Sequence, residues 1–458
     1  MTDAPGETAA DGADELRGDG ADELRGDDAD ELRGDDADEL RGDDADGRAD
    51  DRPNLLLVCV DCLRQDFLRR DAVDTPFLDS LRERGMECTE LYATATTTTP
   101  AVASLLTGAY GEVNGIQSLR RGSLSDDVEP MASVLGDRGY HTEAMATGPL
   151  VPETGLDRGF DVYECRDRDE DMFSDWREDA LDRLAGLPEP FAAFVHLWEI
   201  HEDVRVPDEY DSPAYGETPY GRAFSALDRE VEALVDAVPE DTVVAFVGDH
   251  GESVTHRDNP LRLLAKSVRD AVRYYGGVDT RGLEERLNGY CDGFGPDIHD
   301  HFLENGHGEN VYDFTANVPF VLAGPGVEPS TVDAQVRQID ILPTILDALG
   351  VDHETDGDPI EPGVEDRVAY MRACGASLHG ERNWARAVRY GDAKYVEYPE
   401  RDWPPGVYDL AEDPRELRRV DDPDLEAELA DRLPERGVDP TDVEMLDINE
   451  RLEDLGYL

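Results

Sequence analysis

Short apolar runs recur along the chain and predict the strands of one central sheet. Residues 54–60 form a continuous apolar run that ends at Asp61, the pattern of a parallel strand buried on both faces. Helical patterns such as 75–85 lie between most of these runs. This alternation predicts an α/β fold with a mostly parallel sheet covered by helices on both faces, a three-layer α/β/α sandwich. The further strand candidates are residues 87–95, 141–147, 190–198, 241–249 and 318–324.

Polar residues of chemical interest stand at or just beyond the ends of three predicted strands. They are Asp61, His201, Asp249 and His250. In open parallel sheets, ligands bind beyond the carboxyl ends of the strands. The sequence therefore predicts a polar site at that edge of the sheet.

Three segments lack this alternation of apolar strands and helices. Residues 1–51 contain repeats of an eight-residue acidic unit such as ADELRGDD, rich in Asp and Gly, which predicts a disordered tail; an array that binds a partner is the alternative. Residues 256–305 predict a helical insertion, either a lid over the site or a peripheral element. Residues 366–458 change to short strands and acidic helices, which predicts a smaller C-terminal subdomain with a small antiparallel sheet. The catalytic domain is expected to span 52–365.

The charge of the chain narrows the possible partners. The 458 residues carry a formal charge of −65, and Lys266 and Lys394 are the only lysines. Acidic excess with scarce lysine suits a protein that stays hydrated in concentrated salt, where self-repulsion is screened, a halophilic type of surface. It argues against binding of nucleic acid or an anionic membrane. An anionic substrate would have to be attracted locally, most simply by a bound metal ion.

The expected cellular location and the state of the cysteines follow from sequence patterns that we do not find. We find no apolar run of membrane-spanning length and no signal-peptide pattern, so a cytoplasmic location is the default expectation. Six dispersed cysteines do not resemble a disulfide scaffold. Cys59 and Cys62 form a C-x-x-C pattern at a strand end, which we interpret as two small, partly buried residues, with a redox or metal role as the alternative.

Ligand-type residues come from four separated segments: Asp61, the Thr96–Thr99 run, Asp249-His250 and His307. Oxygen ligands with imidazole suit Mn²⁺, Zn²⁺, Mg²⁺ or Ca²⁺. The threonines directly precede a predicted helix, whose N-terminus cradles a phosphate or sulfate group. A hydroxyl coordinated to a divalent cation there becomes a usable nucleophile. A helix N-cap is the alternative interpretation of the run.

The same segments resemble the sulfatases and their relatives in the alkaline-phosphatase superfamily. RPNLLLVCVDCLRQDFL is similar to the opening strand with its acidic metal ligand, and TTTPAVASLLTG to the sulfatase signature, with Thr98 at the catalytic position. VGDHGE matches the segment that makes Asp249 and His250 metal ligands, and GHGENVYDFTANVPFV makes His307 the matching histidine. The resemblance covers residues 52–420 and implies an alkaline-phosphatase-like fold. In this comparison HLWEIHEDV carries His201 onto a histidine that contacts the substrate or a second metal.

Departures from the family pattern concern the catalytic position itself. Thr98 cannot become the formylglycine that sulfatases form from Cys or Ser, and Ala101 and Val102 replace the signature Ser and Arg. The acidic pair after the first strand is reduced to Asp61, followed by Cys62. Threonine nucleophiles instead resemble the phosphoesterase and phosphotransferase branches of the superfamily, which implies phosphoryl transfer.

We therefore expect a metal-dependent hydrolase of phosphate or sulfate esters, with small molecules or glycans as substrates. One divalent ion is held by Asp61, Thr98, Asp249 and His250; a second ion is possible, although Glu199-Ile200-His201 lacks the spacing of two-metal relatives. The alternatives are a phosphotransferase with a glycan or lipid acceptor, a sulfatase that uses unmodified threonine, and an inactive binding protein. The oligomeric state stays open. A further cluster in the insertion matches no family motif and is interpreted as solvated loop: Asp297, His299, Asp300 and His301.

Overall fold

The computed structural model describes residues 52–454, except 168, 202–203, 256–258, 292–297, 375–383 and 435–442. The chain divides into two units, and all of these residues belong to the second, Asp50–Leu458. The acidic tail predicted for residues 1–51 lies outside the described residues. Over the described part of the chain, helices long and apolar enough to cross a membrane are absent.

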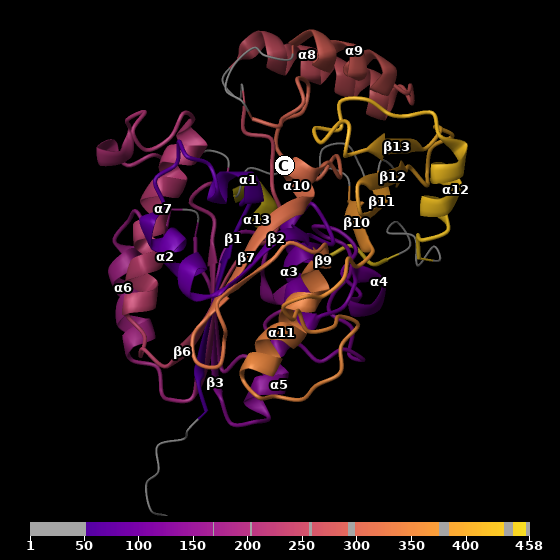
Figure 1. Cartoon of the computed structure of the whole chain (residues 1–458). Helices are drawn as coiled ribbons and strands as arrows, with labels where there is room; N and C mark the ends of the chain where they lie inside the picture. Colours follow the sequence, from indigo (N-terminus) through magenta and orange to yellow (C-terminus); the bar gives the residue numbers. More distant parts are fainter. Residues whose placement is uncertain are drawn as a thin grey trace, which may run out of the picture. The chain divides into compact units, whose positions relative to one another are not determined.

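A large mixed sheet forms the centre of this unit (Figure 1). Its strand order is β4-β3-β5-β1-β6-β7-β2-β8, and β9 pairs with β2. The strands from β4 to β6 are parallel, whereas β7 runs antiparallel to both of its neighbours. The mostly parallel sheet expected from the sequence is therefore confirmed. The strands are β1 (Asn54–Val60), β2 (Met86–Tyr92), β3 (His141–Ala146), β4 (Val162–Cys165), β5 (Phe191–Leu197), β6 (Thr242–Gly248), β7 (Asn317–Ala323), β8 (Ser330–Val332) and β9 (Val336–Arg337).

Helices cover both faces of this sheet. The central strand β1 alternates between two cores: Leu55 and Leu57 belong to one, and Leu56 and Val58 to the other. Helices α3 (Thr98–Thr107), α5 (Met131–Gly136) and α11 (Ile341–Ala348) pack on the first face. Helices α2 (Pro76–Arg84), α6 (Trp176–Ala185) and α7 (Pro219–Asp236) pack on the second. A strand buried on both faces explains why its sequence is apolar throughout rather than alternating.

A second, four-stranded sheet is antiparallel, as expected from the C-terminal sequence. It consists of β10 (Ala369–Ala373), β11 (Ala385–Tyr390), β12 (Ala393–Glu397) and β13 (Gly406–Asp409). Lys394 on β12 is fully buried, where its ammonium contacts Asp313 and Glu416. The remaining helices are α1 (Gln65–Leu68), α4 (Gly111–Asn114), η1 (Pro152–Thr154), η2 (Asp208–Tyr210), α8 (Pro260–Asp270), η3 (Ala271–Tyr275), α9 (Arg281–Cys291), α10 (Asp313–Ala316), η4 (Gln338–Asp340), α12 (Pro423–Ala430) and α13 (Asn449–Asp454).

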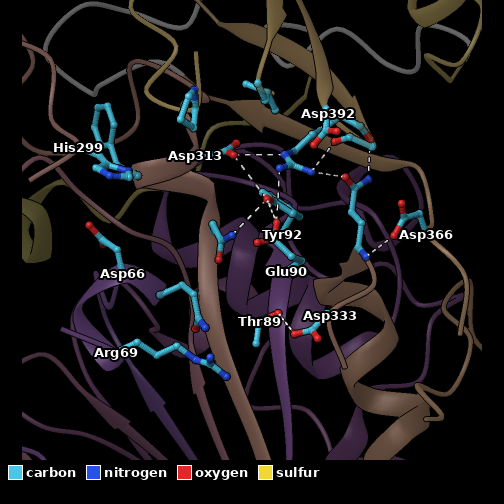
Figure 2. Close-up of a pocket in the computed structure, with 18 residues that line it drawn as sticks. Asp66, Arg69, Thr89, Glu90, Tyr92, His299, Asp313, Asp333, Asp366 and Asp392 are labelled. Carbon is cyan, nitrogen blue, oxygen red and sulfur yellow. Dashed lines mark hydrogen bonds and ion pairs between the residues drawn. The ribbon is translucent and has the colours of Figure 1, made fainter. Parts of the chain in front are cut away.

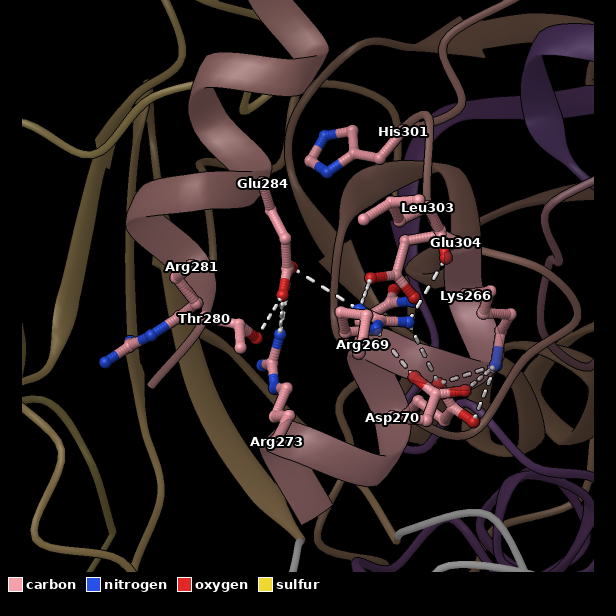
Figure 3. A network of polar contacts seen from close by, with 12 residues as sticks. Lys266, Arg269, Asp270, Arg273, Thr280, Arg281, Glu284, His301, Leu303 and Glu304 are labelled. Atoms are coloured by element: carbon pink, nitrogen blue, oxygen red, sulfur yellow. Dashed lines mark hydrogen bonds and ion pairs between the residues drawn. The ribbon is translucent and has the colours of Figure 1, made fainter. Parts of the chain in front are cut away.

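The helical insertion is held by charged rather than apolar contacts. Arg269 and Arg273 are buried and both pair with Glu284 of α9, at 3.4 and 3.0 Å (Figure 3). Arg269 also pairs with Glu304 at 2.7 Å. Apolar side chains lie on the outer side of these helices; Leu261 is 77% exposed. The insertion therefore buries its polar face, the reverse of an ordinary amphipathic surface helix.

Because Glu284 neutralises two buried guanidinium groups, Glu284→Gln should destabilise the insertion by about 3 kcal/mol, the cost of breaking a buried ion pair. Urea unfolding in molar KCl measures this, since buried pairs are screened little by salt. The matched control is Glu285→Gln, whose partner Arg419 is nearer the surface, with an expected cost below about 1 kcal/mol. Equal unfolding midpoints for both variants would contradict the structural role of Glu284.

Candidate metal-dependent active site

The candidate site lies at the carboxyl edge of the large sheet. Asp61 follows β1 and Asp249 follows the neighbouring strand β6. Backbone hydrogen bonds continue the pairing past the strand ends: the Asp61 N–H donates to Leu197 at 2.7 Å, and the Asp249 N–H to Val60 at 3.3 Å. Adjacent parallel strands therefore place the two carboxylates side by side.

Thr98 is the first residue of α3 and is fully buried. Its hydroxyl donates to Asp61 Oδ2 over 3.4 Å and lies 3.3 Å from His250 Nε2. Thr97 occupies the N-cap position without a side-chain capping hydrogen bond, so capping does not account for the threonine run. Ala101 and Val102, at the departures from the sulfatase signature, are packed in the core. Two segments far from Thr98 in the sequence thus contact its hydroxyl.

The donor atoms around Thr98 fit a divalent cation. Asp249 Oδ1 accepts from the backbone N–H groups of Cys62 and His250, but Asp249 Oδ2 and Asp61 Oδ1 are buried without hydrogen-bond partners. His250 Nε2 lies 3.4 Å from Asp249 Oδ2 and 3.8 Å from Asp61 Oδ1. Two buried carboxylates with unsatisfied oxygens require a compensating positive charge. Carboxylate, hydroxyl and imidazole together suit a divalent metal ion.

The ring nitrogens of His250 and His307 are oriented by backbone carbonyls. His250 Nδ1 lies 3.1 Å from Gly251 O, and His307 Nδ1 lies 3.3 Å from Thr96 O. A contact with a carbonyl assigns the proton to Nδ1, so each Nε2 presents a lone pair. Metal-binding histidines are commonly fixed in this way.

Electrostatics in the site favour an ionised Asp61 carboxylate and a neutral His307 imidazole. Burial alone would raise the pKa of Asp61, but His201 and His250 hold it below its ordinary value. Burial lowers the pKa of His307 well below the usual range, and the neighbouring His250 and His201 lower it further. His307 is therefore neutral near pH 7 and its Nε2 can act as a ligand or an acceptor.

His201 and His307 meet on one side of the site. Their Nε2 atoms are 3.4 Å apart, and the His307 ring also lies against His250, with centroids 4.4 Å apart. Gly308 follows with a φ of +84°, and a Cβ there would lie 2.8 Å from the side chain of Thr97. The glycine lets the His307 loop approach the threonine run. All six predicted site residues are thus brought together.

Two further residues belong to the site. Cys62 is fully buried, with its Sγ 3.8 Å from His250 Nδ1; Cys59, also fully buried, faces the core, so the expectation of partly buried cysteines was wrong. His196 on β5 is fully buried, both ring nitrogens lack hydrogen-bond partners, and its Nε2 lies 4.0 Å from Asp249 Oδ2. In the sequence, a histidine inside an otherwise apolar strand could have identified His196 as a candidate site residue.

The interpretation of residues 297–301 as solvated loop was wrong for two of its members. Asp300 is buried and pairs with Arg64, which follows β1, while the hydroxyl and N–H of Thr255 donate to its other oxygen. His301 is buried against Tyr312. His299 is exposed, and Asp297 lies outside the described residues. Buried acceptors and donors that satisfy one another make this loop an anchor of the insertion.

Glu199, which stands at the acidic position of the family segment, has a structural partner instead. It is buried and pairs with Arg166 at 3.1 Å, and it accepts from the Met172 N–H at 2.9 Å. One of its carboxylate oxygens is thereby paired with protein groups, while Oε2 is buried without a hydrogen-bond partner. It is not among the residues grouped as possible metal ligands within the described part of the chain.

A separate cleft of about 730 Å³ lies beside β2 (Figure 2). Several of its polar groups pair with one another: Thr89 donates to Asp333 at 2.9 Å, and Arg389 donates to Asp313 at 3.2 Å. Residues of both sheets and of the segments beside them line it, among them Tyr92 of β2, Asp313 of α10 and Arg389 of β11. The six predicted site residues are not among them. The cleft is polar and lies between residues of the large and small sheets.

A central β-sheet of this order, with acidic and histidine donors at its carboxyl edge, defines an alkaline-phosphatase-like α/β fold. The phosphonate monoester hydrolase of Agrobacterium radiobacter shares it, with a TM-score of 0.62 and 18% identity over 83% of this chain and 94% of that one. The sulfatase family model matches residues 53–351. The chain belongs to the sulfatase family.

Curated relatives agree with this family. The chain is 24% identical to the uncharacterised sulfatase YidJ of Escherichia coli over 64% of this chain and 67% of that protein. It is 32% identical to the choline-sulfatase of Rhizobium meliloti over 51% of this chain, spanning 44% of that enzyme. Family and fold together make the chain an ester hydrolase by class.

Proposed function

We propose that the chain is a metal-dependent hydrolase of phosphate or sulfate esters in which Thr98 is the nucleophile. One observation carries the proposal: the buried Thr98 hydroxyl lies within 3.4 Å of both Asp61 and His250, beside two carboxylate oxygens that have no partner. Such an arrangement suits a hydroxyl held and made more acidic by a divalent cation. Because threonine replaces the residue that sulfatases modify, phosphate esters are the preferred substrates.

Asp61, Asp249 and His250 would hold the ion, which supplies positive charge to the anionic ester and acidifies the Thr98 hydroxyl. The N-terminus of α3 directs N–H groups at the ester oxygens. Thr98 Oγ then attacks phosphorus in line, and the bond from phosphorus to the leaving oxygen breaks. The proton that leaves the Thr98 hydroxyl reaches the leaving oxygen through solvent. Water then attacks phosphorus, the bond to Thr98 Oγ breaks, and the threonine oxygen regains a proton from that water. His307, whose Nε2 carries a lone pair, accepts a proton in these transfers, with His201 beside it.

The relatives divide between the two substrate classes. The name of the choline-sulfatase states a sulfate ester, and that of the phosphonate monoester hydrolase a phosphorus ester. Small-molecule or glycan esters of either kind therefore form the range to search. The chain has metal-ligand and histidine side chains at the family's positions (Asp61, Asp249, His250 and His307), which favours an active enzyme over a binding protein.

The test is hydrolysis of nitrophenyl phosphate, bis-nitrophenyl phosphate and nitrophenyl sulfate, with Mn²⁺, Zn²⁺, Mg²⁺ or Ca²⁺ in molar KCl. We expect phosphate-ester turnover that disappears after dialysis against a chelator and returns when the ion is restored, because the carboxylate oxygens need the cation. Turnover of the sulfate ester alone would contradict the preference for phosphorus. Activity that persists in the fully metal-depleted protein would contradict metal dependence.

A further inference from the structure

The outer face of the insertion helices is uncharged. Helices α8 and η3 follow one another without a break from Pro260 to Tyr275, and every exposed residue from Asn259 to Val278 is uncharged. Since 33% of the residues of the whole chain are charged, an exposed stretch of this length without a charge is a specific feature of the insertion. The charged residues of the stretch are buried or half-buried instead: Arg262, Lys266, Arg269, Asp270 and Arg273.

Apolar side chains occupy this face at the spacing of helices that pack in pairs. Of the ten large apolar residues that are exposed in the described part of the chain, six lie within residues 261–278, each 42–77% exposed. Five of them recur at intervals of three, four, four and three residues: Leu261, Leu264, Val268, Val272 and Tyr275. Such intervals keep side chains on one side of a helix, as in helices that pack against a partner helix. The face is therefore built for a contact.

The basic groups of the helix are held by protein partners on its inner side. The Arg262 guanidinium donates to the Thr255 carbonyl at 2.9 Å. Lys266 pairs with Asp270 at 2.7 Å and with Glu309 at 3.2 Å. Helices that lie on membranes instead present Lys and Arg beside their apolar face, where these groups attract anionic lipids. The inward basic groups and the charge of −65 on the chain therefore favour a protein partner over a lipid surface.

We propose that this face binds the same face of a second copy of the chain. Two chains that each carry −65 repel one another wherever charged surfaces meet, so they approach at the lowest electrostatic cost where neither presents a charge. In a two-fold dimer the same patch serves both partners, so apolar side chains meet apolar side chains. The six exposed side chains offer about 600 Å² per copy, given about 150–200 Å² for a fully exposed side chain of their size. Two copies together bury about 1,200 Å², the lower end of specific protein interfaces.

The test is analytical ultracentrifugation of the full-length chain in molar KCl, where long-range repulsion is screened. We expect a dimer that dissociates on dilution, because the interface is small. Val268→Glu places a charge in the middle of the apolar face and should weaken self-association about 100-fold or more. Because Val268 is 57% exposed, the variant should keep the thermal unfolding midpoint of the wild-type monomer. The readout is mass, so the result does not depend on the reaction at Thr98.

The matched control is Val113→Glu, a valine on α4 that is 48% exposed outside this face, which should leave the dimer unchanged. Val268→Lys alone should be monomeric like Val268→Glu, whereas an equimolar mixture of the two should form dimers, because opposite charges then meet across the same face. A wild-type chain that is monomeric at every concentration, a dimer that survives in Val268→Glu, or a mixture that stays monomeric would overturn the proposal. Binding of monomeric wild type to phosphatidylcholine vesicles would overturn it in favour of a lipid surface.

Discussion

Thr98→Ala is expected to reduce kcat for phosphate-ester hydrolysis on the order of 10⁴-fold or more, as removal of a nucleophile does in other hydrolases. The reason is geometric: in the described part of the chain, the Thr98 hydroxyl is the one placed between Asp61 and His250, at 3.4 and 3.3 Å. Initial rates on nitrophenyl phosphate, with the preferred ion at saturation, measure the effect.

Two variants of the same threonine run serve as controls. Thr98→Ser retains a hydroxyl and should keep measurable turnover. Thr99→Ala removes a buried hydroxyl that donates to Leu119 O at 3.4 Å, away from the carboxylates, and should change kcat less than tenfold while costing about 1 kcal/mol of stability. Substantial activity in Thr98→Ala, or equal losses in Thr98→Ala and Thr99→Ala, would refute the assignment of Thr98 as nucleophile.

Asp300→Asn is expected to lower the free energy of unfolding by about 3–5 kcal/mol, because it leaves the buried Arg64 without its buried counter-charge. The amide would also meet N–H and O–H donors of Ser253, Val254 and Thr255 that now donate to the carboxylate. Urea unfolding at pH 7 measures the loss. The control is Asp66→Asn, which removes the partly exposed partner of the same arginine and should cost less.

The pH dependence of Asp300 provides an independent check. Burial alone would raise the pKa of Asp300, but Arg64 and the Thr255 hydrogen bonds lower it to about 2. A carboxyl group whose pKa is depressed on folding stabilises the protein above its unfolded pKa of about 4, and this contribution disappears as the pH falls towards 2. The difference between wild type and Asp300→Asn should therefore shrink by about 2 kcal/mol over that window. A constant difference between pH 7 and pH 3 would contradict the ionised pair.

Local sequence patterns predicted the sheet and much of the candidate site. The apolar run of β1 predicts a strand buried on both faces, and the strand ends directly before Asp61. Asp249-His250 marks the end of β6 in the same way. Because the carboxyl ends of parallel strands share one edge, Asp61 from one segment and Asp249-His250 from another could be expected to meet there. The threonine run could be placed at a helix start because Pro100 and an apolar pattern follow it.

Tertiary structure alone decided the environment of the buried polar groups. Cys59 and Cys62 were both expected to be partly buried, yet both are fully buried, Cys62 beside His250 and Cys59 in the core. Asp300 in its sequence context resembles a solvated acidic residue, but it meets Arg64, which is 236 positions away. Strand periodicity and helix starts are properties of neighbouring residues, so the sequence by itself determined them. The partner of a buried charge depends on how distant segments pack, because burial makes an unpaired charge costly and only the folded chain supplies its counter-charge.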